Sequence, residues 1–350
     1  MIYFYSPYRR DETTCAALRA AQAALETSNQ DIFLLPQGPK SGTASPFWDN
    51  RVLSRINTLP AIVPATSIVH FGVDLDFINM IQHYRKPVSK KCTQILVPSW
   101  HSTRLETVPV IRSFFDYCVV PTPEIKKTFM QCVYGKTRTK KLLELPWDVR
   151  MTQTKRDGHI RKNSIKVCVV ADSDAIGNNS NFIFTVLDEL LNSSSDLVFT
   201  VLHSRAFCPA DKQTIKCLLR DFHTRLVFRP MPQLENIALD FHNHDWVWLP
   251  SRRANFGVFA NLALSCGCPV LTWDIAPYSE IIENDFTGIL VPCDTKTNWM
   301  QAPSAIVDTS NFVKYAAMAF SQEKIFETMA AATPTQSTKF NDAWCDLLTP

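Results

Sequence analysis

Residues 251–274 read SRRANFGVFANLALSCGCPVLTWD and follow the run DWVWLP at 245–250. The apolar run predicts a buried strand, the polar stretch a turn, and the segment VFANLALSC a helix that ends near Gly267. Apolar and β-branched residues after Pro269 predict the next strand. This order of elements is typical of an α/β protein with a mainly parallel sheet. Such sheets bind ligands at the carboxyl edge of their strands, where the turn lies.

The turn from Ser251 to Gly257 has the features of an anion site. Gly257 allows the backbone to approach a ligand closely, and the first N–H groups of the following helix carry partial positive charge. Arg252 and Arg253 add fixed charge and forked donors that suit phosphate. The stretch therefore predicts a phosphate-bearing, nucleotide-like ligand. The alternative is an ordinary α/β unit with two solvated arginines.

The alternation of strand-like and helix-like segments extends along the chain in both directions. The strand-like runs are MIYFY, DIFLL, SIVHFG, CTQILVPSW and YCVVPTP in the first half, and IKVCVVAD, DLVFTVLH, RLVFRP and DWVWLP in the second. PTPEIKKTFMQCVYG predicts a helix with Thr122 as N-cap, Pro123 in its first turn and Gly135 at its end. We therefore expect two doubly wound sheets.

Residues 150–164, RMTQTKRDGHIRKNS, are polar and aperiodic and predict the connection between two domains. Two domains also fit a chain of 350 residues, at about 100–200 residues per domain. We expect a first domain at 1–163, a second at 164–320, and C-terminal helices at 321–350 that pack back on the first.

The composition is that of a soluble globular protein, with 46% apolar and 20% charged residues. No apolar run approaches the roughly 20 residues that cross a bilayer. The start, MIYFYSPYRRDE, predicts a first strand and not a signal peptide. Eleven cysteines without a C-x-x-C pair predict reduced thiols in a cytoplasmic protein, with neither a disulfide nor a zinc site.

The net charge of +3 is unevenly distributed. Residues 1–163 hold 23 Lys and Arg against 13 Asp and Glu, a net +10, whereas residues 164–350 hold 13 against 20, a net −7. The basic residues of the first half gather in the segments 84–91, 135–141 and 154–162. Separate basic loops suit a long phosphate backbone. The alternative is a solvated surface without a partner.

Residues 249–294 contain Pro250-Ser251, Phe256-Gly257, Gly267-Cys268-Pro269-Val270, Glu280 and Thr287-Gly288. In this order they resemble the donor-binding segment of retaining GT-B glycosyltransferases, especially glycosyltransferase family 4. As a pattern the resemblance covers most of the chain, including FDYCVVPTPEIKKTF, LPWDV and the terminal FNDAWCDLL. It implies two Rossmann-like, doubly wound domains that face a central cleft, with the donor held by the second domain and the acceptor by the first.

The resemblance also implies the residues of the site. His101, in VPSWHS, stands where the family usually has a histidine that faces the donor sugar, and Glu280 would bind a sugar hydroxyl or a backbone N–H. These two are the expected catalytic residues. The expected donor-binding residues are Arg252, Arg253, Phe256, Gly257, Val258, Arg205, Tyr278 and Ser279. No metal or cofactor is expected, and the co-substrate is a nucleotide sugar, in the first place UDP-glucose.

The chain departs from the family pattern in the donor segment. The family has two glutamates, one for donor-sugar hydroxyls and one for the ribose, and Ala254 and Leu262 stand in their places. The basic pair that usually follows the first strand of the second domain is absent from ADSDAIGNNSN. The cations that could replace this pair are Arg252, Arg253, Arg205 and Arg229. An inactive nucleotide-sugar-binding protein is therefore an alternative to an enzyme.

Three other clusters lend themselves to a simpler interpretation. The acidic motifs at 172–174 and 74–76 predict solvated turns, and HNHD at 242–245 predicts loop residues because no further metal ligands stand at a useful spacing. Arg9, Arg10 and Asp11 follow the first strand. They either face the acceptor or begin a capped helix, with Asp11 or Thr13 as N-cap.

The expected acceptor is a hydroxymethylated pyrimidine base in double-stranded DNA, as in virus-type DNA glycosyltransferases, turned out of the helix to reach the site. The residues expected to contact it are Arg9, Arg10, Asp11, Lys90, Lys91, Lys140 and Lys141. The alternative is a sugar transferase that acts on a lipid-linked or envelope glycan at an anionic membrane. No amphipathic helix with basic and aromatic faces stands out to favour it, and no protein partner is implied.

Overall fold

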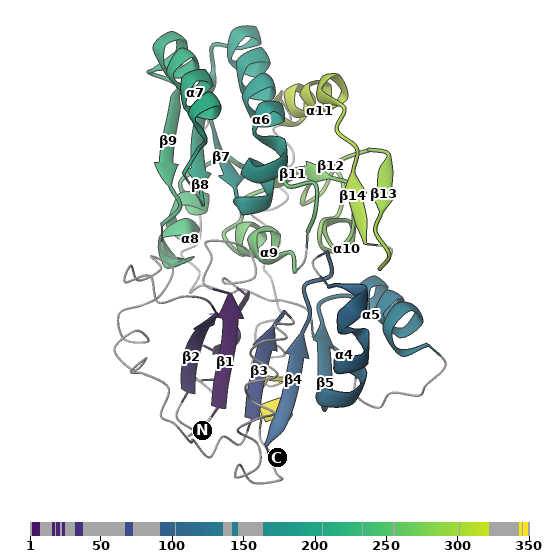
Figure 1. Ribbon diagram of the computed structural model, residues 1–350. Coiled ribbons are helices and arrows are strands. Elements are labelled where there is room, and N and C mark those ends of the chain that lie inside the picture. Colours follow the sequence, from purple (N-terminus) through teal and green to yellow (C-terminus); the bar gives the residue numbers. More distant parts are fainter. Residues whose placement is uncertain are drawn as a thin grey trace. The chain divides into compact units, whose positions relative to one another are not determined.

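The computed structural model describes residues 2–7, 16–17, 19–21, 23–24, 32–37, 67–72, 92–101, 103–135, 142–145, 164–204, 206–232, 234–254, 256–300, 302–321, 343–344 and 346–348. The chain divides into two compact units (Figure 1). The first comprises Met1–Asp148, Thr297–Ala302 and Gln336–Pro350, and the second comprises Val149–Lys296 and Pro303–Thr335. Each unit contains one six-stranded sheet whose described strand pairs are all parallel.

The sheet of the first unit has the strand order β2-β1-β3-β4-β5-β6. Its strands are β1 Ile2–Pro7, β2 Ile32–Gln37, β3 Ser67–Phe71, β4 Thr93–Val97, β5 Tyr117–Val120 and β6 Leu142–Glu144. Its helices and helical turns are η1 Leu105–Thr107, α4 Val108–Phe114, α5 Pro123–Phe129 and η2 Met130–Tyr134. Near the carboxyl end of the chain, Trp344 is fully buried and its ring lies 6.2 Å from that of Phe4 in β1.

The helix predicted from PTPEIKKTFMQCVYG is confirmed. Thr122 is its N-cap and accepts a hydrogen bond from the backbone N–H of Ile125 at 3.4 Å, and Pro123 is the first helical residue, where its missing N–H has no cost. A π-helical turn, η2, prolongs α5 to Tyr134. Gly135 then ends the helix with φ +61°, a left-handed conformation that favours glycine.

The sheet of the second unit has the order β12-β11-β10-β7-β8-β9. Its strands are β7 Ile165–Ala171, β8 Leu197–His203, β9 Leu226–Pro230, β10 Trp246–Trp248, β11 Val270–Trp273 and β12 Gly288–Val291, and a separate hairpin consists of β13 Thr295–Thr297 and β14 Pro303–Ala305. The helices are α6 Ser173–Ser193, α7 Pro209–Phe222, α8 Leu234–His242, α9 Val258–Ser265, α10 Tyr278–Ile281 and α11 Thr309–Ser321.

The chain changes direction across the second sheet between β7 and β10. It runs from β7 outward to β8 and β9, and then returns to the other side of β7 as β10, β11 and β12. Such a topological switch leaves a crevice at the carboxyl ends of the two strands, which is the usual ligand position in open α/β sheets. The residues that directly follow β7 and β10 are therefore the first candidates for a site.

An aromatic cluster fixes these strands from one face of the second sheet. Phe182 of α6, Trp248 of β10, Trp273 of β11 and Phe312 of α11 lie with ring centroids 4.8–6.1 Å apart. Trp248, Trp273 and Phe312 are fully buried. Aromatic side chains at such distances contribute both buried area and edge-to-face attraction. The cluster joins α6 and α11 to the two strands on either side of the predicted ligand turn.

Removing the ring of Phe312 should therefore destabilise the second unit. Phe312→Ala leaves a cavity among three other rings, and we expect the free energy of unfolding to fall by about 3–5 kcal/mol. Met318→Ala, on the same helix but 40% exposed, is the control and should cost less than about 1 kcal/mol. Denaturant unfolding of the three proteins measures this, and equal stability of both variants would contradict the packing described.

Candidate functional site

The turn after β10 is fixed to the two neighbouring elements by hydrogen bonds from both sides. The carbonyl of Pro250 accepts from Asn179 Nδ2 of α6 at 3.3 Å and from Trp273 Nε1 of β11 at 3.4 Å. The buried hydroxyl of Ser251 donates to Asp172 Oδ1 at 2.7 Å. Since Asp172 directly follows β7, this last bond spans the switch point between β7 and β10.

Asp172 corrects one sequence-based expectation. The acidic motif at 172–174 was expected to form a solvated turn, but the side chain of Asp172 is buried, at 8% exposure, and Ser173 already begins α6. The correction has a physical reason, because the carboxylate receives the Ser251 hydroxyl and stands at the N-cap position of α6, where aspartate is a preferred residue.

Gly257 brings the turn against α10. Its backbone has φ +69°, and a Cβ atom at this position would overlap the side chain of Ile281. The positive φ favours glycine independently of any ligand, and a larger residue would also require the end of the Ile281 side chain to move. Gly257 also precedes α9 directly, so the first N–H groups of this helix have no side-chain cap from the preceding residue. The turn, the start of α9 and α10 therefore form one packed corner of the second unit.

The two arginines of the turn have different environments. Arg253 Nε donates to the buried hydroxyl of Ser304 in β14 at 3.1 Å, and the backbone N–H of Ala305 donates to the carbonyl of Arg252 at 3.0 Å. The hairpin of β13 and β14 thus holds the turn. Among the residues that the structure describes, the side chain of Arg252 makes no hydrogen bond or ion pair. Arg252 is therefore the arginine of the turn whose guanidinium is available to an anion.

The other predicted donor residues of this corner separate into buried and exposed groups. Phe256, Val258 and Tyr278 are buried and form the packed wall, whereas Ser279 and Glu280 are exposed in the first turn of α10. The structure brings together the predicted residues Arg252, Arg253, Phe256, Gly257, Val258, Tyr278, Ser279 and Glu280 in the second unit. Arg205 lies outside the described residues.

The positions that would carry two glutamates by resemblance are part of the core. Ala254 and Leu262 are both 0% exposed. Glutamate in either place would be a buried charge without a described partner, which is costly. The apolar residues are therefore consistent with local packing, and any recognition of ribose or sugar hydroxyls must use other groups.

His101 belongs to the first unit and follows β4. It is half-buried, and its neighbour Trp100 is fully buried and donates from Nε1 to the carbonyl of Met300 at 3.1 Å. Trp299 Nε1 donates in the same way to the carbonyl of Thr103 at 2.9 Å. Two indole hydrogen bonds therefore fix the segment that carries His101.

The predicted acceptor residues cannot be placed. Arg9, Arg10, Asp11, Lys90, Lys91, Lys140 and Lys141 lie outside the described residues, as does the acidic motif at 74–76.

Sequence reasoning missed three residues of the donor corner. Asp172 and Asn179 fix the turn from α6, and Ser304 holds Arg253 from the hairpin. Asp172 carried a usable signal, because it directly follows a predicted strand. Asn179 and Ser304 carried none, since they are 71 and 51 residues away from their partners in the chain.

The turn after β10 lies in a segment that is similar to a known protein family. Residues 209–311, which contain the whole turn from Ser251 to Gly257, match the family model described as glycosyl transferases group 1. No curated protein matches the sequence. Apart from Thr297–Ala302, the matched segment lies in the second unit, so the similarity to group 1 glycosyl transferases is found mainly in this unit.

Solved structures extend the similarity to the whole chain. WaaG, a glycosyltransferase involved in lipopolysaccharide biosynthesis, has a TM-score of 0.63 at 11% identity, with 100% of both chains covered. HepE from Anabaena, solved with UDP and glucose, has a TM-score of 0.63 at 12% identity, with 99% of both chains covered. TarM from S. aureus, solved with UDP, has a TM-score of 0.58 at 9% identity. The match covers 83% of this chain and 57% of the TarM chain, so the chain spans little more than half of that protein.

Together these findings define the fold. The protein has the GT-B fold, an α/β architecture with a parallel sheet in each of two Rossmann-like domains, as the sequence predicted.

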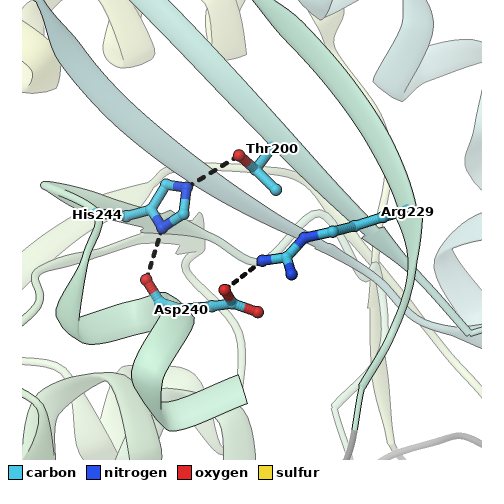
Figure 2. A network of polar contacts seen from close by, with 4 residues as sticks. All are labelled: Thr200, Arg229, Asp240 and His244. Carbon is cyan, nitrogen blue, oxygen red and sulfur yellow. Dashed lines mark hydrogen bonds and ion pairs between the residues drawn. The ribbon is translucent and has the colours of Figure 1, made fainter. Parts of the chain in front are cut away.

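A second cluster of polar side chains lies in the second unit. It contains Arg229, another of the arginines that could replace the basic pair of the family. Arg229 of β9 forms an ion pair with Asp240 of α8 (Figure 2). His244, in the loop before β10, places Nδ1 2.5 Å from the carbonyl of Asp240 and Nε2 3.0 Å from Thr200 Oγ1 of β8. Arg229 is thus occupied by a protein carboxylate, and the HNHD motif provides a loop histidine that is buried against the sheet.

The partners of His244 restrict its protonation state. A carbonyl only accepts, so Nδ1 carries a proton, whereas the Thr200 hydroxyl can donate to an unprotonated Nε2 or accept from a protonated one. Burial lowers the pKa of His244 below its usual value, against the raising effect of the Asp240 carbonyl and carboxylate, and Arg229 and Lys166 lower it further. In the described part of the chain, no three His, Cys, Asp or Glu side chains are grouped to bind a metal. The histidine therefore ties α8 to the sheet.

This arrangement predicts an acid-sensitive contribution to stability. Because the pKa is lower in the folded than in the unfolded state, the contribution of His244 is complete above about pH 6.5 and is lost as the pH falls through the folded pKa. We expect His244→Gln to flatten the dependence of unfolding free energy on pH between 7 and 5, whatever its effect at pH 7. Denaturant unfolding at several pH values tests this. Parallel pH profiles for wild type and variant would show that the histidine has an unshifted pKa.

Proposed function

We propose that this protein is a retaining glycosyltransferase that uses a nucleotide sugar. The observation that carries the proposal is the turn between β10 and α9. It directly follows a strand at the switch point, lies within the segment that matches the glycosyltransferase model, and contains both Arg252 and Gly257, the N-cap residue of α9. These are the groups that a diphosphate requires.

In the proposed reaction an acceptor hydroxyl attacks the anomeric carbon of the sugar as the bond from that carbon to the diphosphate breaks. Attack and departure occur on the same face, so the configuration is retained, and the hydroxyl proton passes to an oxygen of the leaving phosphate. Negative charge grows on the diphosphate in the transition state, so catalysis depends on fixed positive charge near it. Arg252 and the first N–H groups of α9 would supply it, and His101 and Glu280 would orient the sugar.

UDP is the proposed nucleotide of the donor, and UDP-glucose the proposed donor. The support is by analogy, because HepE was solved with UDP and glucose and TarM with UDP. A cytoplasmic location is part of the same proposal. None of the helices in the described residues has the length and apolar character that crossing a bilayer requires.

We propose an anionic acceptor, because the first half of the chain carries a net positive charge. A net charge of +10 on residues 1–163 suits a phosphate backbone, and a hydroxymethylated base in DNA supplies both the backbone and the hydroxyl group. A second candidate is an envelope glycan at an anionic membrane. Its support is that WaaG and the lipopolysaccharide outer core galactosyltransferase WaaB have the same fold over 99–100% of both chains.

The donor site is tested by removing one arginine. Arg252→Ala should weaken UDP binding by about 1.5–3 kcal/mol, the value of a charge-assisted hydrogen bond. Arg220→Ala, an exposed arginine of α7 that is paired with Asp221, is the matched control and should bind as wild type does. Isothermal titration measures both. Equal affinity of the Arg252 variant and wild type would put the phosphate elsewhere. Wild-type binding of UDP-sugars without transfer or hydrolysis would favour the inactive alternative.

The acceptor is tested by salt dependence. If the first half of the chain binds duplex DNA, log K should fall against log salt with a slope of about −4 to −6, from about −0.9 per neutralised phosphate. Replacing Lys140 and Lys141 by Ala should make this slope less steep. The control pair Lys212→Ala and Lys216→Ala removes two exposed lysines of α7 and should not change it.

Gel shifts at increasing salt measure this slope, on duplex DNA with and without hydroxymethylated cytosine. Co-sedimentation with anionic vesicles measures membrane binding in parallel. Tight vesicle binding without a DNA shift at low salt would reject the DNA acceptor and favour the envelope glycan.

A further inference from the structure

The crevice at the switch point of the second sheet contains a carboxylate. Asp172 follows β7 directly, is buried, and accepts the hydroxyl of Ser251, which lies three residues beyond the end of β10. Pro250 and Trp273 adjoin it in the same hydrogen-bonded corner. A carboxyl group therefore occupies the part of the sheet where the ligand of an open α/β domain binds.

This carboxylate also determines which helix start can attract an anion. Asp172 stands at the N-cap position of α6, a helix of 21 residues, and its charge offsets the partial positive charge of that helix end. The N-cap residue of α9 is instead Gly257, and the first turn of α9 contains no acidic residue. An anionic diphosphate is thus disfavoured at the start of α6, where Asp172 stands, and favoured at the start of α9 and at Arg252.

We propose that Asp172 makes the donor site select nucleotide sugars over the free nucleoside diphosphate that the reaction releases. This inference rests on the proposed function. The diphosphate of a nucleotide sugar carries two negative charges. Once the sugar has left, the terminal phosphate becomes a monoester with a second ionisation near pH 6, so that at pH 7.5 the product carries about one charge more. A fixed carboxylate disfavours the product more than the donor, and promotes product release.

The size of the preference for the nucleotide sugar follows from the one additional negative charge on the free nucleoside diphosphate. For two unit charges roughly 8–10 Å apart, with an effective dielectric constant between about 20 and 80, Coulomb's law gives a preference of about 2- to 30-fold. A purely structural role for Asp172, as a helix cap that also holds Ser251, would change stability and the affinities for both ligands together. The ratio of the two affinities therefore separates selection from structure.

The experiment compares Asp172→Asn with wild type in the full chain. Asparagine is as good an N-cap as aspartate, and its Oδ1 can accept the Ser251 hydroxyl, so only the charge is lost. Asp196→Asn is the matched control, because Asp196 also accepts a serine hydroxyl, from Ser195 at 2.8 Å, but stands beyond the other end of α6. The probes are UDP and whichever of UDP-glucose, UDP-galactose and UDP-N-acetylglucosamine binds wild type most tightly, titrated at pH 7.5.

We expect Asp172→Asn to raise the affinity for UDP about 2- to 30-fold more than the affinity for the UDP-sugar, and Asp196→Asn to leave the ratio unchanged. An unchanged ratio in Asp172→Asn, or the same change in both variants, would overturn the inference while leaving the proposed function intact. Failure of wild type to bind UDP and all three UDP-sugars would instead overturn the proposed function, and the inference with it.

Discussion

The main-chain carbonyl of Pro250 fixes the position of the candidate donor site. It accepts hydrogen bonds from Asn179 of α6 and from Trp273 of β11, the strand next to the short strand β10. Three residues of strand cannot orient the long turn that follows them. The two donors do so, and both are buried, which strengthens the bonds.

From this fixed point the turn is held by side chains from three other segments. Asp172 binds Ser251, Ser304 binds Arg253, and Ile281 packs on Gly257. The guanidinium of Arg252 is left without a described protein partner, while Arg253 has a structural role. A preorganised turn with one available cation can stabilise developing charge without reorganising, which is the property that phosphate departure requires.

The sequence predicts the fold well because its signals are local. Buried strands, the Thr122 cap and the glycine after α5 each depend on residues within a few positions of one another, and all are confirmed. The site is less predictable because its contacts join distant residues: neither the burial of Asp172 nor the bond between Arg253 and Ser304 has a local sequence signal. The resemblance predicts a donor site at this corner, but the places of its two glutamates are occupied by the core residues Ala254 and Leu262.

A structure of the protein with bound UDP tests the central claim most directly. The account predicts a diphosphate at the carboxyl ends of β7 and β10, with a phosphate oxygen within hydrogen-bond distance of the Arg252 guanidinium and of a backbone N–H at the start of α9, while Arg253 stays on Ser304. A diphosphate bound away from this turn, with Arg252 in solvent, would contradict it.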